Sequence, residues 1–145
     1  MKTSELEGIA LDLIVDRLEG GCAPTNPDHL RIYLESLNED ELWNELCKYT
    51  HTPGNIRPDI MSKEEMIEDG IAAWRWPPLS TDWAFGGPII EREMISVWPF
   101  DDVTWKAETA RDAIVFEGET PLVAAMRCYV ASKMGDTVDI PEELI

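Results

Sequence analysis

The sequence predicts an α+β fold, in which helices fill the first half and a small antiparallel sheet with one more helix fills the second. Apolar residues recur at helical spacing up to about residue 73. The tract Trp76-Pro77-Pro78 then forbids further helix. From residue 88 the side chains alternate as they do in a strand. At 145 residues the chain fits one domain, so we expect residues 1–145 to form a single domain.

The first two helices are predicted from their caps. Ser4 and Glu7 match a capping box, and Gly20-Gly21 ends the helix that follows, because glycine tolerates the left-handed conformation past a helix end. Asn26 can cap a second helix with Pro27 in its first position.

Two more helices are expected before the sheet. One enters at Asn38, where Glu41 stands three residues later. The next begins with a capping box of Ser62 and Glu65 and runs to about Ala73.

The sheet and the last helix complete the prediction. We expect strands near 88–98, 103–107 and 113–116, packed with the N-terminal, middle and C-terminal helices. Thr120-Pro121 reads as an N-cap followed by proline at the first helical position. The first strand carries apolar and charged residues on both faces, which indicates that it is covered on both sides or joins a partner.

Charge is the extreme feature of the composition. Twenty-nine acidic against twelve basic side chains give a net charge of −17, which repels nucleic acid and anionic membranes and favours basic partners. Solubility alone is the simpler explanation of the same charge. No apolar run reaches the roughly 20 residues of a membrane span, acidic residues interrupt the N-terminus, and the three cysteines form no CxxC. We expect a cytoplasmic protein with free thiols.

Catalytic and metal-binding motifs are missing from the sequence. His29 and His51 are the two histidines, and neither lies near cysteine or carboxylate at ligand spacing. P-loop, GxGxxG and GxSxG motifs do not occur. We therefore expect no enzyme activity, no metal and no cofactor, although carboxylates that meet across the fold stay an open alternative.

One stretch, STDWAFGGPIIERE at residues 80–93, is a candidate binding loop. Trp83 precedes Gly86-Gly87, where missing β-carbons let a ligand approach and expose amide hydrogens. Arg92 follows and can bind a phosphate or carboxylate through two hydrogen bonds. The alternative is a turn with a core tryptophan and an Arg92 paired with Glu91 or Glu93.

Two further features extend this candidate site. The helix start at Thr120 offers free amides to an anion, and tryptophans such as Trp105 offer stacking surfaces, although most tryptophans lie in a core. The predicted ligand-binding residues are Thr81, Asp82, Trp83, Gly86, Gly87, Arg92, Trp105, Thr120 and Arg127.

An acidic face is the alternative interaction site. It consists of Glu39, Asp40, Glu41 and Glu45, on consecutive turns of one predicted helix. Carboxylates spaced along an elongated surface can imitate DNA phosphates. A solvated helix face explains the same pattern without a partner.

Three stretches carry a family resemblance: MKTSELEGIALD, STDWAFGGPIIERE and ETPLVAAMRCYVASKMGDTVDIPEELI. In these the chain resembles NinX-like bacteriophage proteins, a small family of unknown function from accessory regions of tailed-phage genomes. The resemblance covers residues 1–12 and about 80–145, so residues 20–79 are expected to be a helical insertion relative to the family. It implies a phage protein that works in the bacterial cytoplasm.

Three functions fit these observations. The favoured one is a phage protein that counters bacterial defence by sequestering a nucleotide-derived signal, with tryptophan stacked on a base and arginines on phosphates. The second is an acidic DNA mimic that inhibits a basic host protein. The third is a structural or adaptor protein that forms homo-oligomers. None requires direct binding to nucleic acid or membrane.

Overall fold

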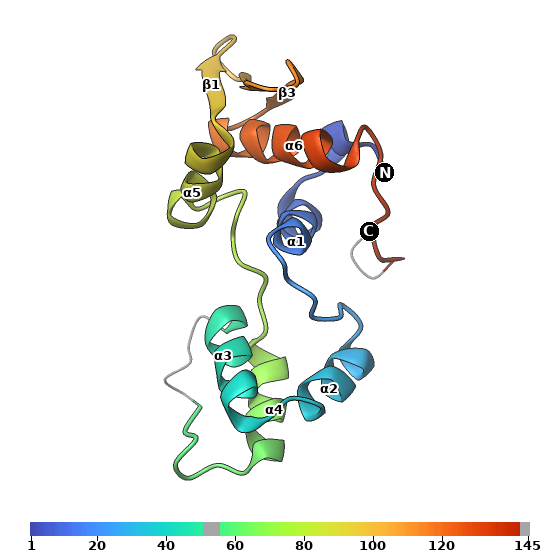
Figure 1. The fold of residues 1–145 in the computed structure, drawn as a ribbon, viewed down its shortest axis with the longest axis vertical. Coiled ribbons are helices and arrows are strands. Elements are labelled where there is room, and N and C mark those ends of the chain that lie inside the picture. The colour runs from blue at the N-terminus through green and yellow to red at the C-terminus, as the bar shows by residue number, and fades with distance from the viewer. Residues whose placement is uncertain (51–55, 143–145) are drawn as a thin grey trace. The chain divides into compact units, whose positions relative to one another are not determined.

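A computed structural model describes residues 1–50 and 56–142 (Figure 1). The chain divides into two compact units: Met1–Gly21 with Pro78–Ile145 form the first, and Cys22–Pro77 form the second. The second unit agrees closely with the segment 20–79 that the resemblance left unmatched. Its status as an insertion in a single domain stays a prediction.

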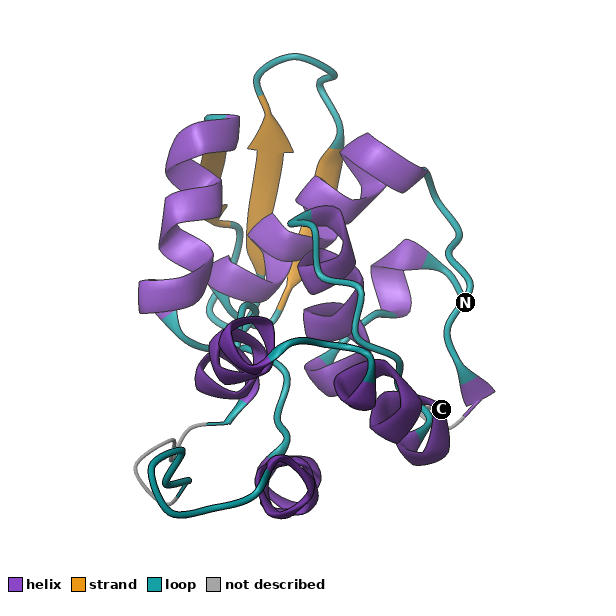
Figure 2. Cartoon of the chain, turned by 60° about the horizontal axis from the view of Figure 1, so that its bottom comes forward, coloured by secondary structure: helices purple, strands orange, loops and turns teal. Residues whose placement is uncertain are grey.

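The first unit contains the predicted antiparallel sheet. Its strands β1 (Ile95–Pro99), β2 (Trp105–Thr109) and β3 (Val115–Gly118) lie side by side in that order (Figure 2). In the register, Ala107 is opposite Val97 on one side and Phe116 on the other. These three residues face the core, where Ala107 is fully buried. The α+β class is confirmed.

Helix α6 (Pro121–Met134) is the centre of this unit. The Val123 amide donates to Thr120 Oγ1 at 3.1 Å, as the sequence predicts. The helix contacts all three strands, α1, α5 and the short 3-10 helix η1, so it is buried almost all round. Its buried residues are Leu122, Ala124, Ala125, Met126, Cys128, Tyr129, Val130 and Ala131.

Residues 83–93 correct the sequence prediction, because they form helix α5 (Trp83–Glu93) and not a loop leading into a strand from residue 88. The Ala84 amide donates to Asp82 Oδ1 at 2.9 Å, which caps the helix. Gly86 and Ile89 are buried three residues apart, and α5 packs against α6. The apparent alternation joined the end of this helix to β1. Met94, in the left-handed region with φ 54°, separates the two elements.

The N-terminal helix also differs from its prediction. Thr3–Glu5 form η1, and α1 begins later, at Gly8–Leu18. Glu7 is the N-cap residue and no side chain caps this end, so the predicted Ser4 capping box is wrong. Gly8, with φ 53°, allows the chain to turn between η1 and α1. The turn buries Leu6 completely, which is a tertiary reason for the later start.

The second unit consists of α2 (Pro27–Glu35), α3 (Glu39–Tyr49) and α4 (Lys63–Ala73). Asn26 Oδ1 accepts from the amides of Asp28 and His29. The predicted capping box of Asn38 and Glu41 is complete, with hydrogen bonds of 2.8 and 3.2 Å.

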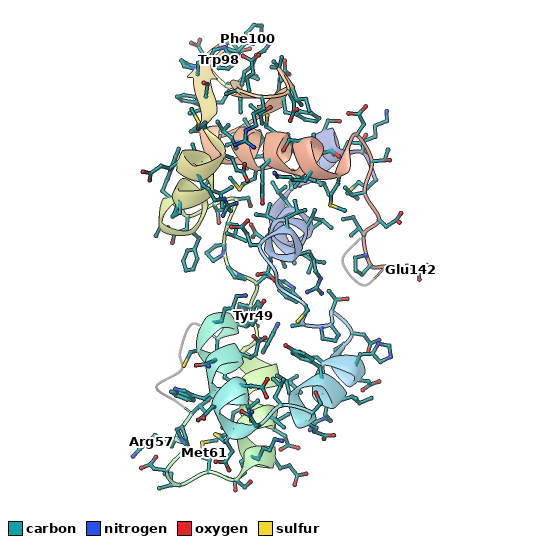
Figure 3. The ribbon with its side chains drawn as sticks, in the orientation of Figure 1. Tyr49, Arg57, Met61, Trp98, Phe100 and Glu142 are labelled. Carbon is teal, nitrogen blue, oxygen red and sulfur yellow. The ribbon has the colours of Figure 1, made fainter. Side chains whose placement is uncertain are left out.

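This unit has a core of its own. Leu34, Leu42, Leu46 and Ile67 are buried in it together with Tyr49, which is labelled in Figure 3. The Tyr49 ring stacks on Trp74 at 4.5 Å between ring centroids. The middle helices therefore pack on one another. Along the described chain, no helix combines the length and the apolar character needed to cross a bilayer.

Candidate binding surfaces

The predicted binding stretch lies at the start of α5. Thr81, Asp82 and Trp83 are exposed, and 52% of the Trp83 surface is accessible. The carboxylate of Asp82 is committed to the cap of α5. Trp83 is thus an accessible aromatic surface and not a core tryptophan.

The two glycines are helical and have different surroundings. The Gly86 amide donates to the Asp82 carbonyl at 3.0 Å, so this amide is used within the fold. A Cβ at Gly86 would collide with the Leu79 carbonyl oxygen and with Leu122 Cδ1, whereas a Cβ at Gly87 would lie 3.9 Å from Trp83. Gly86 therefore serves close packing.

Arg92 is bound within the protein. Its Nη1 and Nη2 each lie 2.7 Å from one oxygen of the Glu19 carboxylate, at the end of α1. Tyr129 Oη donates to Glu19 Oε2 at 2.8 Å, and Glu93 lies 3.4 Å from Arg92. Hydrogen bonding from Arg92 lowers the pKa of Glu19. The alternative pairing of Arg92 with Glu93 occurs, but Glu19 is the closer partner.

Arg127 is also committed to the fold. Its Nε donates to the Leu6 carbonyl at 2.7 Å and its Nη1 donates to the Glu117 carbonyl at 2.9 Å. Burial lowers the pKa of this guanidinium. Trp105 is half-buried in β2 and packs on the core, and Thr120 caps α6. Neither of the two hollows described below is lined by any of the nine predicted residues.

The predicted acidic face lies on α3. Glu39, Asp40 and Glu41 are exposed in its first turn, and Glu45 is half-buried one turn later. Among the described residues, no ion pair involves these four side chains. Glu45 acts on the neighbouring Tyr33. Burial is the largest cause of the raised pKa of Tyr33, and a hydrogen bond with Cys22 and the charge of Glu45 raise it further.

Helix α4 carries a second set of carboxylates, and it contacts both α2 and α3. One of these side chains, Glu68, lies 3.9 Å from Arg31. The exposed acidic residues of α4 are Glu64, Glu65, Glu68 and Asp69. Residues 22–77 hold eleven acidic and five basic side chains, and the rest of the chain holds eighteen and seven, so both units are acidic.

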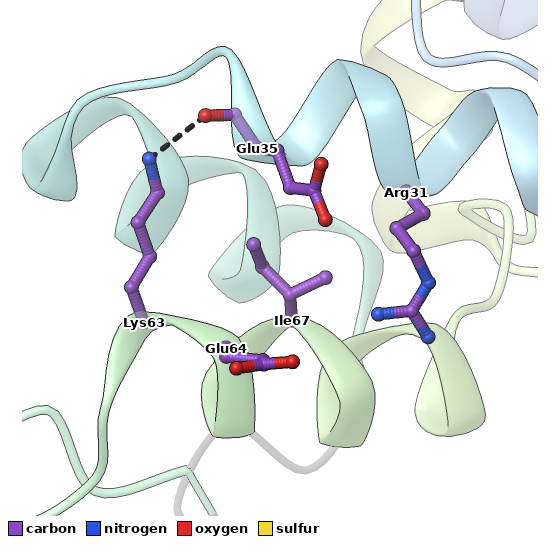
Figure 4. Close-up of a pocket in the computed structure, with 5 residues that line it drawn as sticks. All are labelled: Arg31, Glu35, Lys63, Glu64 and Ile67. Atoms are coloured by element: carbon purple, nitrogen blue, oxygen red, sulfur yellow. Dashed lines mark hydrogen bonds between the residues drawn. The ribbon is translucent and has the colours of Figure 1, made fainter.

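A hollow between α2 and α4 is the feature that sequence reasoning missed. Its volume is about 430 Å³, and its lining consists of Arg31, Glu35, Lys63, Glu64 and Ile67 (Figure 4). Their spacing along each helix is visible in the sequence, but the pairing of α2 with α4 is not. A second hollow, of about 330 Å³, is lined by Lys2, Ser4, Phe116, Asp136 and Thr137.

Metal ligands do not gather in the part of the chain that the structure describes, where no three His, Cys, Asp or Glu side chains are placed to hold an ion. His51 lies outside the described residues. Asp12 is a buried carboxylate, and it accepts a hydrogen bond from the Ser80 amide at 2.7 Å. Its oxygen atoms therefore support the fold.

The chain is similar to one known family. The family model described as Bacteriophage P22, NinX matches residues 2–133. The match includes residues 2–12 and 80–133 of the expected resemblance, and it also spans the middle segment. No curated protein matches the chain. The chain belongs to the bacteriophage P22 NinX family.

Proposed function

We propose that this phage protein counters bacterial defence in the host cytoplasm as a non-catalytic inhibitor that presents an acidic surface to a basic host protein. One contrast carries the proposal. The two arginines expected to hold an anion are bound to Glu19 and to backbone carbonyls. The carboxylates of Glu39 and Asp40 are exposed and have no basic partner among the described residues.

The arrangement of these charges suits a cationic partner. On α4 the exposed Glu65 and Asp69 stand one helical turn apart, which separates their Cβ atoms by roughly 5–6 Å. Such rows of negative charge along rods resemble a nucleic acid backbone. Negative charge accelerates the encounter with a basic partner surface and disfavours binding to acidic partners.

Local structure holds this surface in place before binding. The Asn38–Glu41 capping box fixes the first turn of α3, where three of the carboxylates stand. Negative side chains also stabilise a helix N-terminus, so these acids do not strain the fold. A preorganised surface loses less entropy when it binds.

The test compares two variants with equal charge changes. The face variant carries Glu39→Gln, Asp40→Asn, Glu65→Gln and Asp69→Asn. The control variant carries Glu5→Gln, Asp102→Asn, Asp139→Asn and Glu142→Gln, all at exposed positions of the first unit. Host proteins captured from a nuclease-treated extract are identified, purified and titrated at low and high salt, with duplex DNA as competitor.

We expect DNA-competitive binding that weakens with salt, and a loss of about tenfold or more in affinity for the face variant alone. Equal losses in the two variants would show that only net charge matters. Unchanged affinity in the face variant would contradict the proposal.

Nucleotide sequestration is a second proposal, favoured by the accessible ring of Trp83 beside the N-terminus of α5. A phosphate would have to displace Glu19 from Arg92. Trp83→Ala is the variant to test, because Trp83 is exposed and its truncation removes little core packing. This proposal predicts that cyclic or ADP-ribose-type nucleotides raise the melting temperature of the wild type and not of Trp83→Ala. No shift with any such nucleotide would contradict it.

A structural or adaptor role with homo-oligomers is the third proposal. Phe100 and Val103, in the loop between β1 and β2, are 58% and 74% exposed and offer an apolar contact (Figure 3). Light scattering of the wild type against Phe100→Ser tests it. A monomer at all concentrations would contradict it.

A further inference from the structure

We infer that the hollow between α2 and α4 receives an arginine or lysine side chain of the basic partner. The inference rests on the proposed function and names the chemical group that the acidic unit recognises. The hollow is lined by two basic, two acidic and one apolar side chain (Figure 4). Its ligand class follows from which of these charges are already used.

Lys63 is held within the fold, and Arg31 has a more distant partner. Lys63 Nζ donates to the carbonyls of Glu35 and Leu37, at 2.9 and 2.6 Å. These carbonyls belong to the last residue of α2 and the turn after it, where a cation is favoured by the helix dipole. Arg31 faces Glu68 at 3.9 Å. An anionic ligand would have to compete with these partners.

The two carboxylates are not paired. Among the described residues, neither Glu35 nor Glu64 takes part in an ion pair. Both side chains are exposed, and the Glu35 carboxylate points toward the space beside Ile67 in Figure 4. With Glu68, which faces Arg31, three carboxylates stand against two cations at the hollow, so its formal charge is negative by one.

The shape fits a long side chain with a charged end. Ile67 lines the hollow between the polar groups and, at 2% exposed, offers a small apolar surface there. Lysine and arginine place aliphatic stems on apolar surface while their charged heads stay polar. A guanidinium can also bind a carboxylate through two parallel hydrogen bonds, so we expect arginine to bind more tightly than lysine.

The probe is N-acetyl-arginine methylamide, which carries one guanidinium and no other charge. Its control is the citrulline counterpart, which is neutral and nearly the same shape. Both are titrated into the 15N-labelled full chain and followed by NMR. We expect saturable shifts at the amides of Glu64 and Ile67 with arginine, with a Kd on the order of 1–10 mM, and none with citrulline.

Variants assign the binding to the two carboxylates. The pair Glu35→Gln and Glu64→Gln should weaken arginine binding about tenfold. The pair Glu5→Gln and Asp102→Asn removes the same charge from the first unit and should leave the titration unchanged. Both pairs lie at exposed positions, and the NMR spectrum shows whether each variant is folded.

Three outcomes would each overturn the inference. They are equal shifts with the citrulline compound, no shifts with the arginine compound, and undiminished arginine binding by the variant with Glu35→Gln and Glu64→Gln. The first two outcomes need no variant. If arginine does not bind but the face variant loses its salt-sensitive host partner, the inference fails and the proposed function stands. If arginine binds and no host protein does, the proposed function fails.

Discussion

Arg92 binds Glu19 through two parallel hydrogen bonds of 2.7 Å, across 73 positions of sequence. The pair joins the end of α1 to α5, and Tyr129 of α6 donates to the same carboxylate. A residue that the sequence offers as a ligand-binding cation is therefore a structural link between three helices.

The first prediction concerns the strength of this link. The side chains of Arg92 and Glu19 are 51% and 25% exposed, so solvent screens the pair. We expect a coupling free energy of about 1 kcal/mol in a double-mutant cycle of Arg92→Met and Glu19→Gln, measured by urea unfolding. A coupling indistinguishable from zero would show that the contact does not stabilise the fold.

The second prediction concerns acid. Hydrogen bonding from Arg92, and then from Tyr129, lowers the pKa of Glu19 from its ordinary value of 4.5. The folded state thus binds this proton less tightly than the unfolded state, and the stabilisation is present above that value and is lost as the pH falls below it. The stability difference between wild type and Glu19→Gln should shrink on acidification. A constant difference from neutral pH to about pH 3 would contradict this.

The third prediction concerns Asp12. Burial raises the pKa of its carboxyl above the ordinary value of 3.8. Here the folded state binds the proton more tightly, so this group lowers stability as the pH rises from 3.8 through the folded pKa. Asp12→Asn keeps an oxygen for the Ser80 amide and removes the buried charge. We expect it to match or exceed wild-type stability at neutral pH, by urea unfolding.

The matched change Asp12→Ala leaves the buried Ser80 amide without its acceptor. It should lower the free energy of unfolding by about 1–3 kcal/mol. If Asp12→Asn is as damaging as Asp12→Ala, the charge itself stabilises the fold.

The fourth prediction separates the two glycines of α5. Gly86→Ala would place a Cβ against the Leu79 carbonyl and 2.6 Å from Leu122 Cδ1, and should cost about 1–3 kcal/mol. Gly87→Ala meets nothing closer than 3.9 Å and should be neutral or stabilise by up to about 1 kcal/mol through helix propensity. Thermal unfolding compares the two variants. Equal effects would contradict the packing role of Gly86.

Helix starts were the most predictable part of the fold. Asn26, Asn38, Ser62 and Thr120 all cap the helices for which they were predicted. Ser62 accepts from the Glu65 amide, but the Glu65 side chain does not complete the predicted capping box. Each cap joins a side chain to an amide two or three residues away, so the necessary groups are adjacent in the sequence. The Ser4 cap failed because burial of Leu6 and the turn at Gly8 compete with it.

The start of β1 was less predictable. In residues 89–98 the helical face of Ile89 and the alternating face of Ile95 to Val97 run together without an obvious break. The boundary is Met94, whose left-handed conformation no local residue type announces. Packing of α5 on α6 decides between the two periodicities there.

The candidate sites divide in the same way. The acidic face on α3 is exposed as the helical spacing predicts, since residues one turn apart share a face whatever packs elsewhere. The hollow lined by Glu35 and Glu64 exists because α2 packs on α4.

The sequence by itself determined the α+β class, the family, the charge and four helix starts, because these depend on composition or on groups a few residues apart. Tertiary structure alone decided that Arg92 belongs to Glu19 and that Gly86 is a packing residue. It also brought two unpaired carboxylates to one hollow. Those outcomes depend on which helices meet, and no local pattern encodes a contact across 73 residues.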